Sequence, residues 1–263
     1  MQKIVTIITI CLNEEKVIEN TINSVLMQDF EEFEYIIKDG QSSDSTNEII
    51  EKYTYKFNQK KIPFFHYVEK DNGIYDAMNW AVKKAKGKWV IFMNAGDSFY
   101  NSNVLNDIFK YKRYNSADIL YGHTVYKMSG GYKIVVCNKH ENLVKGDGIC
   151  QQSCFIRRNL FEKKQFDTNF NILADYDFLL SLMQEKKKFI NINIIVSIFN
   201  HEGISSRSVE KCEKEFIKAF EKNELIPPRR KTKLRIFVSE IFTNVCPTLS
   251  DLLVCYKLCK RGI

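Results

Sequence analysis

The sequence has no long hydrophobic run. The first apolar segment, KIVTIITI at residues 3–10, is followed within a few positions by the polar residues NEE. A stretch of about 8 residues is too short for the core of a signal peptide and far too short to span a bilayer. We therefore expect a cytoplasmic protein without a leader peptide and without a membrane-spanning helix.

The sequence also lacks the cysteine pattern of a zinc site. Its eight cysteines are scattered, with no CxxC pair and no histidine at zinc-finger spacing, so we expect reduced cytosolic thiols. The net charge of +7 is modest for 263 residues, and part of it lies in one run at 227–235. A charge gathered in one place indicates a local anionic partner and not a nucleic-acid-binding domain.

The first 93 residues alternate between apolar strands and amphipathic helices. Apolar runs predict strands at 3–10, 33–38, 63–69 and 88–93. Apolar residues at helical spacing predict helices at 13–28, 43–53 and 73–87. We expect Asn13 to cap the start of the first helix and Gly87 to end the third. Such alternation predicts an α/β fold with a Rossmann-like, mostly parallel sheet and helices on both faces.

The second half of the chain has a different pattern. Two apolar runs at 117–127 and 131–137, joined by MSGG, predict a β-hairpin. A helix is expected from about Ala174 to Lys186, a strand at 188–199 and a charged helix at 207–224. The sequence contains no internal repeat and no low-complexity segment.

Polar and acidic residues follow each predicted strand of the first half. In an open parallel sheet, ligands bind beyond the carboxyl ends of the strands, so these residues converge on one edge. A purely structural set of loops would scatter such groups. The residues after the four strands include Thr9, Asn13, Glu14, Asp39, Gly40, Asp44, Asp71, Gly73, Asn94 and Asp97.

The turn after the first strand, TICLNEE, contains no glycine. A dinucleotide-binding turn or a P-loop needs glycines so that the backbone can approach phosphate, and the two acids here would repel phosphate. A divalent cation held by a carboxylate can neutralise a diphosphate instead. Asp97 in FMNAGDSF (92–99) is a candidate for that role, although NAGD is also favourable turn chemistry on its own.

Five blocks occur in a fixed order along the chain. They are TIITICLNEEKVIENTINSVLMQ, YIIKDGQSSDST, EKDNGIYDAMNWAVKKAKGKWVIFMNAGDSF, CQQSCFIRR and FNILADYDFLLSL. Together, over about residues 3–206, they resemble the family 2 glycosyltransferases, and most of all the colanic-acid-type enzymes of bacterial cell-surface polysaccharide. The resemblance implies a GT-A fold, a nucleotide-sugar donor, a divalent cation (Mn²⁺ or Mg²⁺) and an inverting mechanism.

The resemblance also implies roles for single residues. Asp97 would be the last carboxylate of the DxD motif and bind the metal, and Asp39 would accept a hydrogen bond from the nucleobase. Asn94 and Gly96 stand where the family often has acids, so we expect weak metal binding without the donor. The implied donor-side residues besides Asp39 are Thr9, Asn13, Glu14, Gly40, Asp44, Asp71, Gly73, Asn94 and Gln152.

The catalytic base is expected near residue 175, because inversion requires a group that takes the proton of the acceptor hydroxyl. ILADYDFLLSLMQ offers Asp175 and Asp177, which a helix separates by about 200°, so both cannot face one cleft. Asp175 stands where the ED motif of the family has its second acid, with Ala174 in place of the glutamate. We therefore expect Asp175 to be the base and Asp177 to be a helix N-terminal charge.

Two further blocks are interpreted in the same way. In CQQSCFIRR (150–158), Gln152 is expected to contact a sugar, whereas Arg157 and Arg158 are expected to be solvated. FNHEGISSR (199–207) resembles the GGxS loop of the family. His201 in this loop either contacts the diphosphate or the metal, or is an ordinary surface histidine.

The C-terminal tail combines positive charge with apolar segments. Five basic residues at 229–235 precede IFVSEIFTNVC and, after Pro247, LSDLLVCYKLCK. These segments either form a helical pair that packs on the domain or make a peripheral contact with the membrane through residues 227–263. The second alternative would place the protein at the inner face of the cytoplasmic membrane.

We therefore predict a GT-A domain at 1–206, with a nucleotide-binding half at 1–98 and an acceptor-side half at 99–206, and a helical tail at 207–263. The predicted activity is transfer from a nucleotide sugar, expected to be a UDP-sugar, to a glycan or lipid-linked glycan of a bacterial surface polysaccharide. One alternative is a sugar-nucleotide pyrophosphorylase, which would need a glycine-rich, basic loop where CLNEE stands. The other is a non-catalytic sugar-nucleotide-binding protein.

Overall fold

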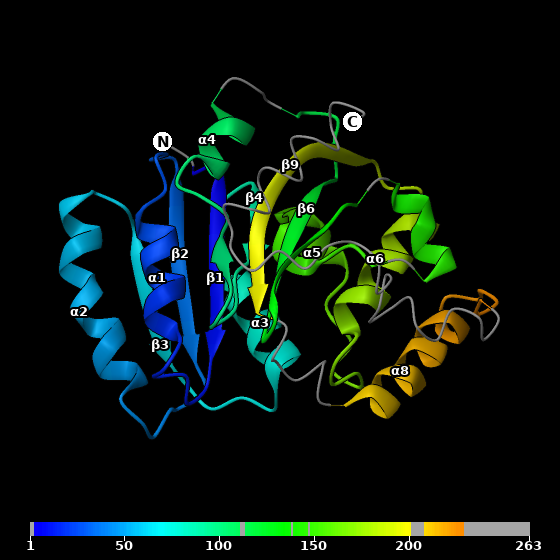
Figure 1. The fold of residues 1–263 in the computed structure, drawn as a ribbon, viewed down its shortest axis with the longest axis horizontal. Coiled ribbons are helices and arrows are strands. Elements are labelled where there is room, and N and C mark those ends of the chain that lie inside the picture. The colour runs from blue at the N-terminus through cyan, green and yellow to red at the C-terminus, as the bar shows by residue number, and fades with distance from the viewer. Residues whose placement is uncertain (1–2, 111–113, 138, 147, 201–207, 229–263) are drawn as a thin grey trace.

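The computed structural model describes residues 3–110, 114–137, 139–146, 148–200 and 208–228. Parallel strands form the first half of the sheet, in the order β3-β2-β1-β4. They are β1 (Val5–Cys11), β2 (Phe33–Asp39), β3 (Phe64–Val68) and β4 (Trp89–Phe92). The helices that connect them are α1 (Ile18–Leu26), α2 (Thr46–Gln59) and α3 (Ile74–Lys84). The predicted alternation of strand and helix is confirmed (Figure 1).

The second half adds mostly antiparallel strands to the same sheet. β8 (Cys154–Arg157) lies antiparallel to β4, followed by β6 (Ile119–Met128), β9 (Phe189–Asn200) and β5 (Ser98–Phe99). β6 and β9 are parallel, and β6 forms the predicted hairpin with β7 (Gly131–Val135). The helical segments are α4 (Val104–Phe109), η1 (His140–Lys145), η2 (Gln151–Ser153), α5 (Arg158–Lys163), α6 (Ala174–Gln184) and α8 (Val209–Lys222).

Helices cover both faces of the sheet, because alternate side chains of each strand point to opposite sides. α1 and α2 pack on the face that carries Ile7 and Ile37. α3, α5, α6 and α8 contribute to the core on the other face, which carries Ile8 and Ile36. The helix predicted at 207–224 is present as α8 and lies against α6 (Figure 1).

The apolar periodicity of the sequence does not predict β5, β8, α4 or α5. These elements contain only 2 to 6 residues, which is less than two turns of helix or a few alternations of a strand. They form because the neighbouring elements bury them, and Phe99, Leu105 and Phe155 are all buried.

Several of the predicted helix boundaries are wrong, and α2 runs to Gln59, six residues beyond its predicted end at 53. α1 begins at Ile18 after Val17, and Asn13 lies earlier, at φ 56°, in a conformation that asparagine tolerates. α3 ends at Lys84, and the following Ala85 is already extended, so Gly87 does not end the helix. A Cβ atom at Gly87 would lie 2.5 Å from the backbone nitrogen of Thr6. Glycine is needed there because the chain passes close to β1.

Within the described ranges, no helix is both long and apolar enough to cross a bilayer. The basic and apolar segments predicted for the tail, at 229–263, lie outside the described residues, and so does His201.

Candidate functional site

The loops after β1 and β2 are joined by hydrogen bonds at the carboxyl edge of the sheet. The Asn13 backbone N–H donates to the Ser42 Oγ at 2.8 Å, and Asn13 Oδ1 accepts from the Ser43 backbone N–H at 2.8 Å. Asp44 accepts hydrogen bonds from the backbone N–H groups of Glu15 and Thr46, at 3.2 and 3.0 Å. Asn13 and Asp44 therefore hold two loops of the first half of the chain together.

Asp39, at the end of β2, is fully buried and already accepts hydrogen bonds on both oxygens. The Ser42 backbone N–H lies 2.6 Å from Oδ1, and the Ser42 hydroxyl lies 2.5 Å from Oδ2. The Cys11 thiol donates to Oδ2 at 3.4 Å, and burial, reinforced by Asp39, raises the pKa of this thiol far above its ordinary value. A ligand N–H that binds to Asp39 would therefore have to replace or share the contact with Ser42.

Lys38 is a buried cation at this edge that the sequence analysis missed. Its Nζ lies 2.6 Å from Asp71 Oδ2 and 2.6 Å from the Glu69 carbonyl oxygen, so it ties the end of β3 to β2. Asp71 Oδ1 accepts the Gly73 N–H at 3.1 Å, and Gly73 has a φ of 124° that favours glycine. A lysine directly after the apolar residues YII, near the end of a predicted strand, is the signal that could have identified it.

Gly40 and Thr9 are two further predicted site residues, and they have different surroundings. A Cβ atom at Gly40 would lie 3.0 Å from Asp71 Oδ2, so glycine leaves room for the carboxylate of Asp71. The Thr9 side chain is fully buried, and its hydroxyl lies 2.6 Å from the Met93 carbonyl oxygen. The structure therefore places the Thr9 side chain inside the sheet and not at the edge.

Asp97 is buried where three segments meet, just before β5. Its Oδ2 accepts a hydrogen bond from Gln152 Nε2 at 2.9 Å, and its Oδ1 accepts the Asn200 backbone N–H at 2.9 Å. Burial raises the pKa of Asp97 to about 7, against the lowering effect of these two hydrogen bonds. The charge of Glu14 raises this pKa further, so Glu14 and Asp97 influence each other electrostatically. The structure thus brings Gln152 into contact with Asp97, and Glu14 near enough for its charge to act on the carboxylate.

The turn that carries Asp97 also fits a hard divalent cation. The Asn94 Oδ1 is buried and has no hydrogen-bond partner among the described residues, although the Asp97 N–H donates to the Asn94 carbonyl oxygen at 3.0 Å. A carboxylate and an unpaired amide oxygen in one turn match the oxygen ligands that Mg²⁺ and Mn²⁺ prefer. No group of three or more His, Cys, Asp or Glu side chains in the described ranges is arranged to hold a metal. The other ligands would have to come from the donor and from water.

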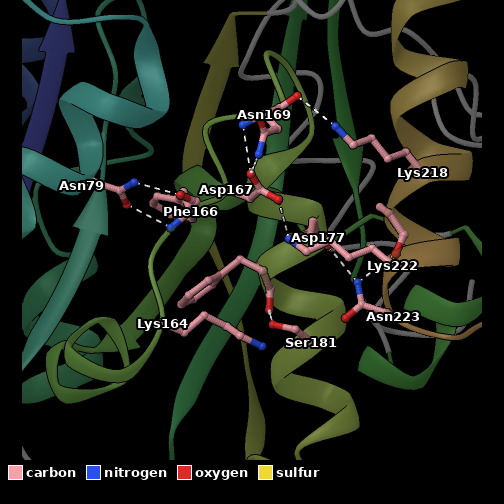
Figure 2. A network of polar contacts seen from close by, with 12 residues as sticks. Asn79, Lys164, Phe166, Asp167, Asn169, Asp177, Ser181, Lys218, Lys222 and Asn223 are labelled. Carbon is pink, nitrogen blue, oxygen red and sulfur yellow. Dashed lines mark hydrogen bonds and ion pairs between the residues drawn. The ribbon is translucent and has the colours of Figure 1, made fainter.

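Asp175 and Asp177 point in different directions from the first turn of α6. The Tyr75 hydroxyl of α3 lies 2.9 Å from Asp175 Oδ1. Asp177 instead accepts hydrogen bonds from Lys222 Nζ at 2.7 Å and Asn223 Nδ2 at 2.8 Å (Figure 2). The two acids therefore face different surroundings, as predicted from the helical spacing. Asp177 links α6 to the C-terminal end of α8.

The electrostatics of Asp175 differ from those of an exposed carboxylate. Burial raises its pKa, the Tyr75 hydrogen bond and the backbone N–H of Tyr176 lower it, and the charge of Glu215 raises it. Burial raises the pKa of the Tyr126 phenol as well, and Cys150, Cys137, Asp175 and Asp97 add to this effect. Asp97 and Asp175 therefore both act on one phenol of β6.

The prediction that Arg157 is solvated is wrong. Its guanidinium lies 4.0 Å from the centroid of the Trp89 ring and donates to the Tyr114 carbonyl oxygen at 2.7 Å. This side chain closes the end of the sheet opposite to the site, where β8 pairs with β4. Arg158 does reach the surface, and it pairs with Glu162 at 2.7 Å.

Comparison with known proteins connects this geometry to a family. Residues 6–186 match the family model described as glycosyl transferase family 2. A PGL/p-HBAD biosynthesis glycosyltransferase of Mycobacterium bovis is 27% identical over 221 residues, which are 81% of this chain and 82% of that protein. The putative teichuronic acid biosynthesis glycosyltransferase TuaG of Bacillus subtilis is 34% identical over 98 residues, 36% of this chain and 37% of that protein.

Solved structures of glycosyltransferases share the fold. Staphylococcus aureus TarS 1–349 in complex with UDP-GlcNAc aligns with a TM-score of 0.67 at 18% identity, over 89% of this chain and 70% of that chain. The mannosyltransferase PcManGT from Pyrobaculum calidifontis, in complex with GDP-Man and Mn²⁺, aligns with a TM-score of 0.65 at 15% identity, over 90% and 68% of the two chains. The predicted GT-A fold is confirmed.

Proposed function

This chain belongs to glycosyl transferase family 2 and is a glycosyltransferase, and we propose that it is an inverting, metal-dependent enzyme that uses a nucleotide sugar. The observation that carries the proposal is the turn after β4, which contains both the buried Asp97 and Asn94, whose Oδ1 has no hydrogen-bond partner among the described residues. The donor is proposed to be a UDP-sugar, in line with the UDP-GlcNAc complex of the similar TarS. The product is an extended bacterial surface polysaccharide.

The nucleoside part of the donor binds at the edge formed by the loops after β1, β2 and β3. Asp39 accepts a ring N–H of the nucleobase, which takes over the contact now made by the Ser42 hydroxyl. Lys38 keeps Asp71 in place and offsets its charge at the same edge. Asn13 and Asp44 shape this pocket through the hydrogen bonds that join its loops.

Asp97 and Asn94 would hold the divalent cation. When bound, the ion neutralises the charge that develops on the departing nucleoside diphosphate. Glu14 and Gln152 complete the surroundings of Asp97, and the Gln152 amide fixes the orientation of the carboxylate through its hydrogen bond to Oδ2.

Asp175 acts as the base on the acceptor side. As the acceptor oxygen bonds to C1 of the donor sugar, the bond from C1 to the diphosphate oxygen breaks, and Asp175 Oδ takes the hydroxyl proton. This single displacement inverts the configuration at C1. The raised pKa brings the carboxylate closer to the working pH, where a general base is most effective.

The acceptor is a growing glycan or a lipid-linked glycan. A peripheral contact of residues 227–263 with the inner face of the cytoplasmic membrane would bring the site close to a lipid-linked acceptor. The five basic residues at 229–235 supply the positive charge that this part of the proposal requires.

A panel of nucleotide sugars, each incubated with acceptor glycans with and without Mn²⁺, tests the proposal by release of the nucleoside diphosphate. We expect release with one donor class, dependence on the metal, and a product of inverted anomeric configuration by NMR. Asp175→Asn should lower kcat by about 10²- to 10⁴-fold while donor binding survives. Metal-independent turnover, retention of configuration or an active Asp175→Asn would refute the corresponding part.

A further inference from the structure

Two side chains from different helices converge on the start of α6, the helix that carries Asp175. Tyr75 comes from α3 and Glu215 comes from α8. α8 begins at Val209, beyond the part of the chain that matches the family model, which ends at residue 186.

Tyr75 holds Asp175 from the side of the nucleotide-binding half. Its hydroxyl lies 2.9 Å from Asp175 Oδ1 and 2.5 Å from the Ile172 carbonyl oxygen. The ring is buried and packs against Phe166, with the two ring centroids 5.6 Å apart. Since α3 starts directly after Gly73, this contact links the loop of Asp71 to the proposed base.

Glu215 holds the start of α6 from the other side. It is 6% exposed, and its Oε1 accepts the Asn171 N–H at 2.8 Å. Its Oε2 accepts the N–H groups of Ile172 and Leu173, each at 2.9 Å. These groups precede the first turn of α6, where Leu173 as the N-cap residue offers no side-chain acceptor. Glu215 therefore caps α6 from another helix, and it does so as an anion, because these hydrogen bonds hold its pKa below the ordinary value.

We propose that Tyr75 and Glu215 are positioning residues for Asp175, and that α8 is consequently part of the catalytic unit. This inference rests on the proposed role of Asp175 as the base. The hydroxyl of Tyr75 fixes the carboxylate, and Glu215 fixes the backbone from which the carboxylate projects. A shift of the carboxylate away from the acceptor hydroxyl lowers the rate of proton transfer while the donor pocket stays intact.

The two residues act on Asp175 with opposite electrostatic sign. The Tyr75 hydrogen bond stabilises the carboxylate and lowers its pKa, whereas the negative charge of Glu215 raises it. Among the described residues, the charge of Asp175 also acts on Cys212 of α8, Cys154 of β8 and Tyr126 of β6, and burial raises the pKa of each. Two of the four cations of α8 are directed elsewhere: Lys218 to the Asn169 carbonyl oxygen, and Lys222 to Asp167 and Asp177 (Figure 2).

The test compares Tyr75→Phe and Glu215→Gln with wild type in the full chain, by kcat, donor KM and the dependence of kcat on pH. We expect kcat to fall about tenfold in each variant, with donor KM within about twofold of wild type. The acid limb of the kcat profile should move to higher pH in Tyr75→Phe, because the carboxylate loses a hydrogen bond. It should move to lower pH in Glu215→Gln, because a neighbouring negative charge is gone.

Two matched variants separate a positioning role from general damage. Tyr53→Phe removes another tyrosine hydroxyl that donates a hydrogen bond to a carboxylate, in this case that of Glu19 at 2.8 Å. Glu221→Gln neutralises an exposed acid of α8. Both should keep the wild-type kcat and pH profile. The inference would be overturned if Tyr75→Phe and Glu215→Gln both keep the wild-type kcat and the wild-type dependence of kcat on pH while Asp175→Asn is inactive. An active Asp175→Asn would instead refute the proposed base. If Glu215→Gln does not fold, the kcat of Tyr75→Phe and the shift of its acid limb to higher pH are sufficient to support or overturn the inference.

Discussion

The first half of the chain, proposed to bind the nucleotide, and the second half, proposed to bind the acceptor, hold their proposed site residues in different ways. In the first half, Asn13 and Ser42 are 29 positions apart in sequence, and Lys38 and Asp71 are 33 apart. These partners come from consecutive loops of one parallel sheet. Asp175, in the second half, is held by more distant segments: Tyr75 of the first half lies 100 positions away, and Glu215 reaches back 43 positions to Ile172. The proposed base thus depends on helices that are distant along the chain.

This difference predicts which property each half controls. Damage to the loop contacts of the first half should weaken donor binding together with stability, because one set of contacts serves both. Damage to the contacts between α6 and α8 should act on kcat and stability and leave the donor pocket as it is. Three substitutions test this division, beginning with the largest expected effect.

Lys38→Met should have the largest effect on the first half. It leaves Asp71 without its cation and removes a hydrogen bond to the Glu69 carbonyl oxygen. Loss of one partner of a buried ion pair typically lowers the free energy of unfolding by about 3–5 kcal/mol. We expect the free energy of unfolding to fall by an amount near the lower end of this range, because the Asp71 side chain is 15% exposed. The donor KM should rise as well. Urea unfolding and donor titration measure the two effects.

Lys52→Met, an exposed lysine of α2, is the matched control and should leave both quantities unchanged. Adding Asp71→Asn to Lys38→Met should recover part of the lost stability, because the uncompensated charge is removed. If the double variant is no more stable than Lys38→Met, the ion pair does not explain the loss.

Asp177→Asn should have the next largest effect, on the second half. It replaces the charged contact with Lys222 by a neutral one and disturbs the hydrogen bond from Asn223 (Figure 2). Hydrogen bonds to charged groups contribute about 1.5–3 kcal/mol, and the half-exposed Lys222 places the expected loss near the lower value. We expect kcat to fall and donor KM to stay constant. Lys214→Met, which breaks an exposed pair on the same helix, should change neither stability nor kcat. A raised donor KM in Asp177→Asn would contradict the division.

Asp97→Asn should have the smallest effect on stability, and one that depends on pH. Burial raises the pKa of Asp97 from 3.8 to about 7, so the folded state holds this proton to higher pH than the unfolded state. The stabilising contribution of protonated Asp97 is lost as the pH rises between these values, and at pH 8 the ionised group destabilises the fold. The stabilising effect of the neutral asparagine should therefore be larger at pH 8 than at pH 5, which lies inside this range, and each kcal/mol of it raises Tm by about 2–4 °C.

This measurement is made without metal or donor, by thermal unfolding at the two pH values. Mn²⁺ together with the nucleoside diphosphate should raise the Tm of the wild type and not that of the variant. The Tm difference between the two proteins at pH 8 should then become smaller or change sign. A Tm difference that is equal at pH 5 and pH 8 would show that the charge of Asp97 is not its source.

The sequence predicted the first half of the fold well because its elements are long and regular. The strands around Ile7 and Ile36 and the helix around Met78 show clear apolar periods, and the structure confirms them. Asn13 and Gly87 were misassigned because each resembles a standard helix boundary signal, while loop contacts and the approach to Thr6 decide their conformations. Arg157 could not be recognised as half-buried, since a guanidinium over Trp89 has no local signature.

The sequence by itself determined the alternating sheet, the edge at which polar residues gather and the candidate acids Asp39, Asp97 and Asp175, because these follow from apolar periods and short motifs. Only the tertiary structure showed that Lys38 is a buried partner of Asp71, that Gln152 binds Asp97, and that Tyr75 and Glu215 hold the start of α6. The physical reason is the distance along the chain between the residues that interact. Strands and helices arise from neighbouring residues, whereas the burial, charge and position of each carboxylate depend on groups that folding brings together from distant parts of the chain.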